Sequence, residues 1–396
     1  MSNHFDGRLI PLEAFRGMAA FIVLLHHFFL GFSPLTTGLL DVARDADSLI
    51  GNPLFVFVNG TGAVSFFFTL SGFVLCWSLV RKPQPGKIIH AALKRWPRLA
   101  LLVLLSTLIS CTLFKLNLYY FDQAAQVSGS PWLSSFAYAG WTPEFEPSYL
   151  SAFVQGVTTF LTGVVTYNTN LWTMQPEFIG SLLVYLLAYL CVSRWQNSGQ
   201  LLRLSWVAVF FFIFLKKLFP FVMGVMCCVH LLQAPRKSSW LASGLCMLLG
   251  LYGLGYMIPA EWYAWVQYLP DFWQKRSQTL LHTAGSLLII YATMTNGQLF
   301  ALFNGRLCQW LGRLSFTLYL IHVLVICSVS SYVYLLFTDH GWATHWVLWG
   351  TLLITIVGSV AASLPLSMLD DWWVRQVNQW VKRWWPVDSA PRTDAA

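Results

Sequence analysis

Apolar residues occur along this chain in repeated runs that are separated by short polar segments. A helix needs roughly 20 residues to cross about 30 Å of hydrocarbon, and most of the runs come near that length. The pattern predicts an all-α fold, a polytopic bundle of about ten transmembrane helices. The predicted spans cover residues 11–32, 62–80, 97–115, 172–194, 204–215, 218–233, 239–258, 278–296, 315–337 and 346–369.

The distribution of Lys and Arg predicts how this bundle is oriented. Basic residues in short loops favour the cytoplasmic side of a membrane. With a cytoplasmic N-terminus, 17 basic residues fall in cytoplasmic segments and 6 on the opposite side. We therefore predict an integral membrane protein with both termini in the cytoplasm.

Composition supports a lipid environment and excludes several other classes. Hydrophobic residues make up 57% of the chain and charged residues 10%, against about 25% charged in soluble domains. The net charge of +8 could suit nucleic acid, but the basic residues lie between apolar runs, where they act as topology signals, so we expect no nucleic-acid partner. The eight Cys lie mostly inside apolar runs without metal-site spacing, so no metal and no disulfide is expected.

Two domains of very different size are predicted. Residues 1–370 form one transmembrane domain, and residues 371–396 form a cytoplasmic amphipathic tail. In that tail Trp373, Val377, Trp380 and Trp384 recur at helical spacing, which predicts a helix lying on the inner leaflet. The long segment 116–171, rich in aromatic and acidic residues, is either a lid over an outer cavity or ordinary interfacial packing.

The first span contains an arginine and a histidine with a suggestive spacing. Arg16 and His27 are 11 residues apart, so on a helix they share one face within roughly 20° and lie about 16 Å apart along the axis. His26 points roughly 80° away. An arginine inside a span is costly and needs a partner, for which Glu13 is the local candidate. The alternative is a structural ion pair with a core histidine.

Other candidate residues stand at the ends of later spans. Arg95 and Arg98 enter the third span from the cytoplasm, where their guanidinium groups suit phosphate, although the positive-inside rule also explains them. Glu177 opens the fourth span on the outer side and places a carboxyl at membrane depth, suited to acid-base or acceptor-binding work. Its alternative role is a favourable interaction with the helix dipole.

Small and polar residues mark two further spans. Ser71, in the second span, lies among small residues where a backbone or a ligand arm can approach closely. Ser315, Tyr319 and His322 form a polar stripe on one face of the ninth span. Interhelical hydrogen bonding is the ordinary explanation of such a stripe.

These motifs, taken in order, resemble those of the acyltransferase-3 family of integral membrane O-acyltransferases. Phe316 stands where the family motif has a Tyr. The matching motifs are Arg16 with His27, the Phe-Phe-x-x-Ser-Gly-Phe segment 67–73, Arg95 with Arg98, the Trp-Thr-x-x-x-Glu segment 172–177, and the late segment 315–322.

The resemblance implies a transfer of an acyl group, with acetyl expected, from cytoplasmic acyl-CoA to a hydroxyl of an extracytoplasmic or membrane-linked glycan. No permanently bound cofactor is expected, and the implied location is the bacterial inner membrane. The implied catalytic residues are His27 as base, Arg16 and Glu177. Arg95, Arg98 and Ser71 are implied in donor binding, with Ser315, Tyr319 and His322 as further polar site residues.

Two alternatives stay open at this point. In a transporter or flippase, Arg16, His27 and Glu177 would line a path for a substrate or for protons. Within the acyltransferase hypothesis, the acyl group could pass through a covalent intermediate on His27 before it reaches the acceptor.

Overall fold

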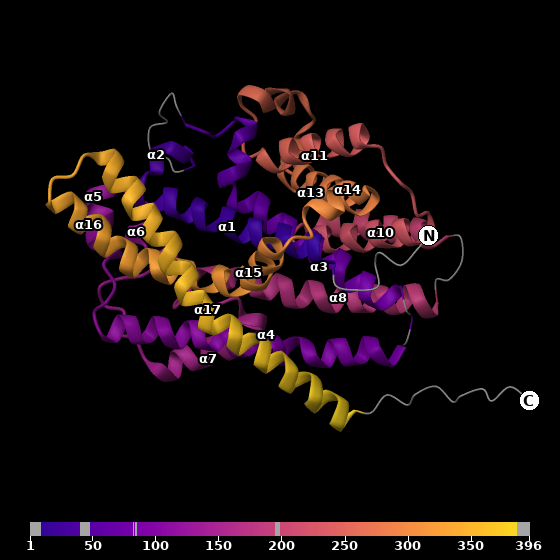
Figure 1. The fold of residues 1–396 in the computed structure, drawn as a ribbon, viewed down its shortest axis with the longest axis horizontal. Coiled ribbons are helices and arrows are strands. Elements are labelled where there is room, and N and C mark those ends of the chain that lie inside the picture. Colours follow the sequence, from indigo (N-terminus) through magenta and orange to yellow (C-terminus); the bar gives the residue numbers. More distant parts are fainter. Residues whose placement is uncertain (1–8, 40–47, 82, 84, 195–198, 386–396) are drawn as a thin grey trace, which may run out of the picture.

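The computed structural model describes residues 9–39, 48–81, 83, 85–194 and 199–385. All regular elements within these residues are helical, and α1, α4, α8 and α10 run along the long axis of the molecule (Figure 1). The α-helices of eight or more residues are α1 (Ile10–Phe32), α3 (Gly60–Val80), α4 (Pro85–Lys115), α5 (Phe121–Ser128), α7 (Tyr149–Thr162), α8 (Met174–Ser193), α9 (Gln200–Phe214), α10 (Phe219–Gln233), α11 (Trp240–Gly255), α13 (Ser277–Thr295), α15 (Arg306–Val325), α16 (Ser331–Asp339) and α17 (Thr344–Trp384).

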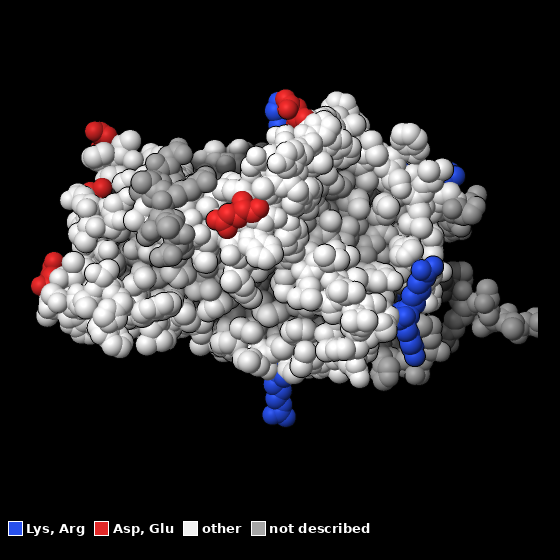
Figure 2. All heavy atoms as spheres, turned by 90° about the horizontal axis from the view of Figure 1, so that it is seen from above, with Lys and Arg blue, Asp and Glu red and all other residues white. Residues whose placement is uncertain are grey.

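The prediction of an all-α membrane protein is confirmed. Each of the ten predicted ranges falls on helix, and Figure 2 shows a broad face with few charged side chains, as contact with lipid requires. Helices α9, α10 and α11 are apolar but shorter than a full span. The number of spans and the side of the termini stay predictions. Within the described residues, six stretches are long and apolar enough to cross a membrane: Ile10–Phe32, Gly60–Val80, Gly86–Lys115, Thr169–Ser193, Arg306–Asp339 and Thr344–Trp384.

Helix α4 begins well before the predicted third span. It starts at Pro85 and carries Pro97 in its interior, whereas the sequence predicts a start at residue 97. A hydropathy pattern detects only the apolar part of a helix, so the basic first turns of α4 did not appear in the predicted span. The helix continues through these turns because its polar side chains reach water. As a result Arg95 lies ten residues into α4, about 15 Å from its start.

Helix α8 begins beside the middle of α4 and not beside the end of α4 at Lys115, which differs from the arrangement that the sequence predicts. Helix α7 precedes it and packs against the half of α4 that ends at Lys115, where Thr107 Oγ1 donates a hydrogen bond to Ala152 O at 2.8 Å. A buried connection containing the 3₁₀ helix η2 (Thr169–Thr173) then leads into α8. Helix α8 packs against the other half of α4, with Tyr185 close to Ile88. Glu177 in its first turn is therefore inside the bundle.

The predicted tail is continuous with the last span. Helix α17 runs without a break from Thr344 to Trp384, and the part after residue 370 packs on α4. Val377 is buried there, and Trp373 Nε1 donates a hydrogen bond to Pro97 O at 2.7 Å. Trp380 and Trp384 remain exposed. Residues 386–396 of the predicted tail lie outside the described residues.

The contact between α1 and α15 depends on two glycines. A Cβ added at Gly17 would lie 2.6 Å from the Leu311 carbonyl group, and one added at Gly312 would lie 2.8 Å from Glu13 O. The two backbones can approach closely because neither glycine carries a side chain. This approach brings the polar residues of α1 and α15 together.

We predict that Gly17→Ala destabilises the protein by about 1–3 kcal/mol, because the added methyl group forces the α1 and α15 backbones apart. Gly244→Ala in α11 is the matched control, since a Cβ there meets nothing within 4 Å and alanine favours helix. Unfolding of both variants in the same detergent measures the difference. Equal stability of the two variants would contradict the packing argument.

Candidate active site

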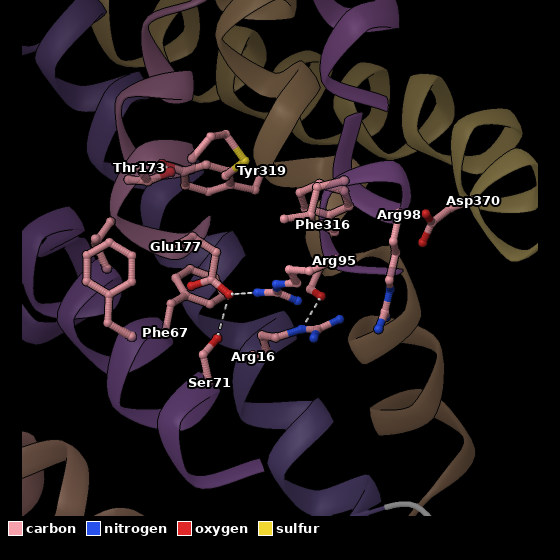
Figure 3. Close-up of a pocket in the computed structure, with 15 residues that line it drawn as sticks. Arg16, Phe67, Ser71, Arg95, Arg98, Thr173, Glu177, Phe316, Tyr319 and Asp370 are labelled. Carbon is pink, nitrogen blue, oxygen red and sulfur yellow. Dashed lines mark hydrogen bonds and ion pairs between the residues drawn. The ribbon is translucent and has the colours of Figure 1, made fainter. Parts of the chain in front are cut away.

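A cavity with charged walls lies at the centre of the bundle, between α1, α3, α4, α8, α15 and α17 (Figure 3). It contains most of the residues that the sequence singles out, although they are far apart along the chain. The polar residues that line it are Arg16, Ser71, Arg95, Arg98, Thr173, Glu177, Ser315, Tyr319 and Asp370. Apolar side chains, including Phe67, Phe316 and Leu99, complete the wall.

Glu177 connects three helices at one side of this cavity. Its Oε1 accepts a hydrogen bond from Ser71 Oγ of α3 at 2.9 Å and pairs with the guanidinium of Arg95 of α4. The Arg95 and Glu177 side chains are only 8% and 15% exposed. The sequence predicts Arg95 at the inner face and Glu177 on the outer side. Their contact shows instead that the two side chains lie at one level of the bundle, and the side of the membrane that each end of the bundle faces stays a prediction.

Arg16 reaches across to α15 rather than along its own helix. Its Nε donates a hydrogen bond to Ser315 Oγ at 2.9 Å. Among the described residues no ion pair within 4 Å joins Arg16 to Glu13, so the direct hydrogen-bond partner of Arg16 is Ser315 and not the predicted Glu13. The backbone of Glu13 lies close to Gly312, while the side chain of Arg16 lines the cavity.

Arg98 stands at the more open side of the cavity. Its side chain is exposed, and within the described residues it has no hydrogen-bond or ion-pair partner. Asp370 of α17 lies next to it on the same side (Figure 3). The cavity is therefore lined by three arginines and two carboxylates, of which Arg95 and Glu177 are paired with each other.

His27 lies outside this cavity, in a separate pair with His322. The two rings are nearly parallel, and His27 Nδ1 is 2.9 Å from His322 Nε2. His322 is fully buried, and its Nδ1 is 2.9 Å from Leu318 O. The ring of Trp132, in the short helix α6 (Pro131–Ser134), also lies nearly parallel to that of His27, at a centroid distance of 5.1 Å.

These contacts assign the protons on both rings. A carbonyl oxygen only accepts, so His322 Nδ1 must carry a hydrogen and donate it to Leu318 O. In a neutral His322 ring, Nε2 then holds a lone pair, and His27 Nδ1 donates to it. The lone pair of neutral His27 is therefore on Nε2, which is the atom available to take a proton.

His26 has a different environment, as the helical spacing predicts. Its Nδ1 donates a hydrogen bond to Val58 O at 2.8 Å, and the ring is buried against Gly60 of α3. A Cβ at Gly60 would lie 2.6 Å from that ring. These contacts are what a structural histidine makes.

Tyr319 lies between the cavity and the histidine pair. Its ring is 6.0 Å from that of His322 and its hydroxyl is 2.9 Å from Thr173 Oγ1. Two amides hold η2 on α15, because Asn168 Nδ2 donates to Leu320 O and Asn170 Nδ2 donates to Tyr319 O, both at 2.8 Å. The three polar residues predicted on the ninth span therefore have different partners. Ser315 binds Arg16, Tyr319 binds Thr173, and His322 binds His27.

Sequence reasoning missed three residues of this region. Asn170 and Asp370 have only one weak signal, which is a polar residue at the edge of an apolar run. Trp132 appears in the sequence as one aromatic among many in the outer segment. Its position against His27 depends on how residues 116–148 fold, which no local pattern shows.

A family model for an acyltransferase domain matches residues 10–367. The chain belongs to the acyltransferase-3 family. It is therefore a membrane acyltransferase that transfers acyl groups other than aminoacyl groups, and this membership favours transfer over transport. The match includes every polar residue of the cavity except Asp370. No curated protein and no solved structure matches the chain.

Breaking the Arg95–Glu177 pair on one side should destabilise the acyltransferase, because it leaves a buried charge without its partner. We expect Glu177→Leu or Arg95→Met alone to cost about 3–5 kcal/mol, and the double variant to cost clearly less than either. Unfolding in detergent is the measurement. The exposed pair Arg313–Asp371 is the control, since Arg313→Met should change stability by less than about 1 kcal/mol. Additive losses in the double variant would contradict this prediction.

Proposed function

We propose that this acyltransferase moves an acyl group, with acetyl expected, from cytoplasmic acyl-CoA to a hydroxyl of an extracytoplasmic or membrane-linked glycan. Its proposed location is the bacterial inner membrane. The observation that carries the proposal is the chain of hydrogen bonds from Leu318 O through His322 to His27. It supports His27 as a base, because it fixes the ring and leaves Nε2 unprotonated.

In the proposed reaction, His27 Nε2 removes the proton from the acceptor hydroxyl while the oxygen attacks the thioester carbon. The tetrahedral intermediate expels the thiolate of CoA, which receives the same proton from His27. One ester bond forms, one thioester bond breaks, and the products are the acylated acceptor and free CoA. His27 ends as it began.

The contacts around His27 favour its charged state during this cycle. When Nε2 binds a proton, the hydrogen bond from Nδ1 to His322 Nε2 becomes charge-assisted and stronger. The face of the Trp132 ring lies over the same imidazolium, in an arrangement that attracts cations. We assign His322 and Trp132 to positioning roles, since each acts through His27.

The cavity supports the proposed binding of the donor. Arg98 is exposed and unpaired within the described residues, and Arg16 lies deeper, next to Ser315. In this proposal Arg98 binds phosphate, while Arg16 orients the arm that carries the thioester or offsets negative charge on its carbonyl. Arg95 and Ser71, proposed as donor ligands, also hold Glu177 in place.

The reaction is tested with protein purified into lipid nanodiscs and supplied with acetyl-CoA. Release of the CoA thiol should rise several-fold when a glycan with free hydroxyls is added, and mass spectrometry should find an O-acetyl ester in it. A matched glycan whose hydroxyls are methylated is the control. Equal thiol release with both glycans, or acyl transfer only to amines, would contradict the proposal.

Replacing His27 should affect chemistry, whereas replacing His26 should affect packing. A general base contributes about 10²–10⁴-fold to a rate, so His27→Ala should lower turnover by at least about a hundredfold without weakening donor binding. His26→Ala should lower stability but keep turnover within about tenfold of the original value. Equal losses of turnover in both variants, at matched amounts of folded protein, would exclude His27 as the base.

A labelling experiment separates direct transfer from an acyl intermediate on His27. With radiolabelled acetyl-CoA and no acceptor, direct transfer predicts no label on the protein after rapid quenching at neutral pH. An intermediate predicts label that is lost in His27→Ala and retained in His26→Ala.

A further inference from the structure

The two helices that carry the histidine pair are both bound by one separate part of the chain, residues 119–141, which we call the α5–α6 cap. It contains α5, α6 and a short turn, and it lies at the same end of the bundle as α16 (Figure 1). Two backbone carbonyl groups hold it there. Ser130 Oγ donates a hydrogen bond to Leu30 O at 2.6 Å, and Tyr120 N donates one to Cys327 O at 3.0 Å.

The positions of these two carbonyl groups connect the cap to the histidines. Leu30 follows His27 by three residues in α1. Cys327 follows His322 by five residues and belongs to the π-helical turn η4 (Ile326–Ser330). Such turns interrupt the regular hydrogen bonds of an α-helix and are frequent at functional sites. Here one carbonyl group of the turn binds the cap, so the cap is attached close to each member of the histidine pair.

A turn of unusual conformation follows α6 in the cap. Phe136, Ala137 and Tyr138 all have left-handed backbone, with φ of 49°, 57° and 66°, which residues with a side chain rarely adopt. This conformation persists only where the surrounding structure determines it, and it is common next to active sites. The Phe136 ring is fully buried, and its centroid lies 5.0 Å from those of Phe114 and Phe121. The buried ring therefore holds the turn in place.

The turn and the Ser130 bond together hold Trp132. The amide of Ala137 donates a hydrogen bond to Trp132 O at 2.7 Å. At the start of α6, Ser130 Oγ accepts a hydrogen bond from Leu133 N at 3.2 Å while it binds α1. Ser130 and Trp132 are only 1% and 2% exposed. The Trp132 side chain is thus confined to its position beside the His27 ring.

We propose that Ser130 is a positioning residue of the reaction, which binds α6 to the end of α1 and thereby keeps Trp132 on the ring of His27. The inference rests on the proposed role of His27 as the base. An imidazole can rotate about its side-chain bonds, and a base that is out of line with the acceptor hydroxyl loses rate even in a folded protein. The contacts with Trp132 and His322 limit this rotation. In this role the cap stays in place through the cycle, in contrast to a lid.

Replacement of Ser130 tests this role through the difference between kcat and KM. Ser130→Ala removes the bond to α1, so kcat per folded protein in nanodiscs should fall about tenfold to a hundredfold. The KM for acetyl-CoA should stay the same, because the central cavity is unchanged. Ser130→Thr keeps the hydroxyl and should keep most of the activity. Ser134→Ala is the matched control, since this exposed serine of α6 donates its hydroxyl hydrogen to Pro131 O in the same helix.

A disulfide between α1 and α6 tests the same attachment without the serine. A Cβ added at Gly31 would lie 3.4 Å from Leu133 Cγ, so Gly31→Cys and Leu133→Cys together place two thiols within bonding reach. Added diamide forms the bond and takes up both thiol hydrogens. In the Ser130→Ala background the disulfide should restore most of the lost kcat, and a reductant should abolish this gain. The two single-Cys variants, treated in the same way, are the controls.

Unchanged kcat in folded Ser130→Ala would overturn the proposal. So would a loss of kcat when the disulfide forms in the protein that retains Ser130, because the cap would then be a lid that must open. If Ser130→Ala does not fold, this second measurement decides, and retained kcat supports the rigid cap. Failure of the proposed function appears separately, as turnover that persists in His27→Ala. Inactive His27→Ala beside fully active Ser130→Ala would remove only the role of the cap.

Discussion

The buried pair of Arg95 and Glu177 is the interaction on which the rest of the site depends. A charged side chain inside a membrane bundle costs several kcal/mol unless a partner offsets it. This pair, with Ser71, fixes α3, α4 and α8 at one depth. Because the pair is confined to one side of the cavity, Arg16 and Arg98 remain available for a ligand.

The hydropathy pattern predicted the long helices well because each contains an apolar run of nearly the length of a span. It failed where length and depth are decided by tertiary contacts. Helix α7 has 14 residues, too few for a span. Only the structure shows that α7 packs against one half of α4 and α8 against the other half. The early start of α4 was hidden by the basic residues around Arg95.

The candidate site was predicted in its residues more than in its arrangement. The spacing of Arg16 and His27 placed both on one face, and both do contact α15, through Ser315 and His322. The same spacing could not show that Ser315 rather than Glu13 is the partner of Arg16, because a helix wheel contains no information about the neighbouring helix. Trp132 lay outside any such argument, since its contact with His27 joins parts of the chain about 100 residues apart.

The separation between the cavity and the histidine pair has a physical consequence for any transfer across the membrane. In the proposed reaction an acyl group passes from one compartment to the other, while protons and ions must not. Tyr319 stands at the boundary, bonded to Thr173 of η2, and the amides of Asn168 and Asn170 tie that segment to α15. Irregular backbone within a membrane bundle is tolerated where it is buried in protein, and the side-chain amides of this segment bind α15. In the proposed reaction these bonds keep η2 fixed on α15 between the cavity and the histidine pair, so the reactive end of the donor must reach past this segment while its charged groups stay with Arg98.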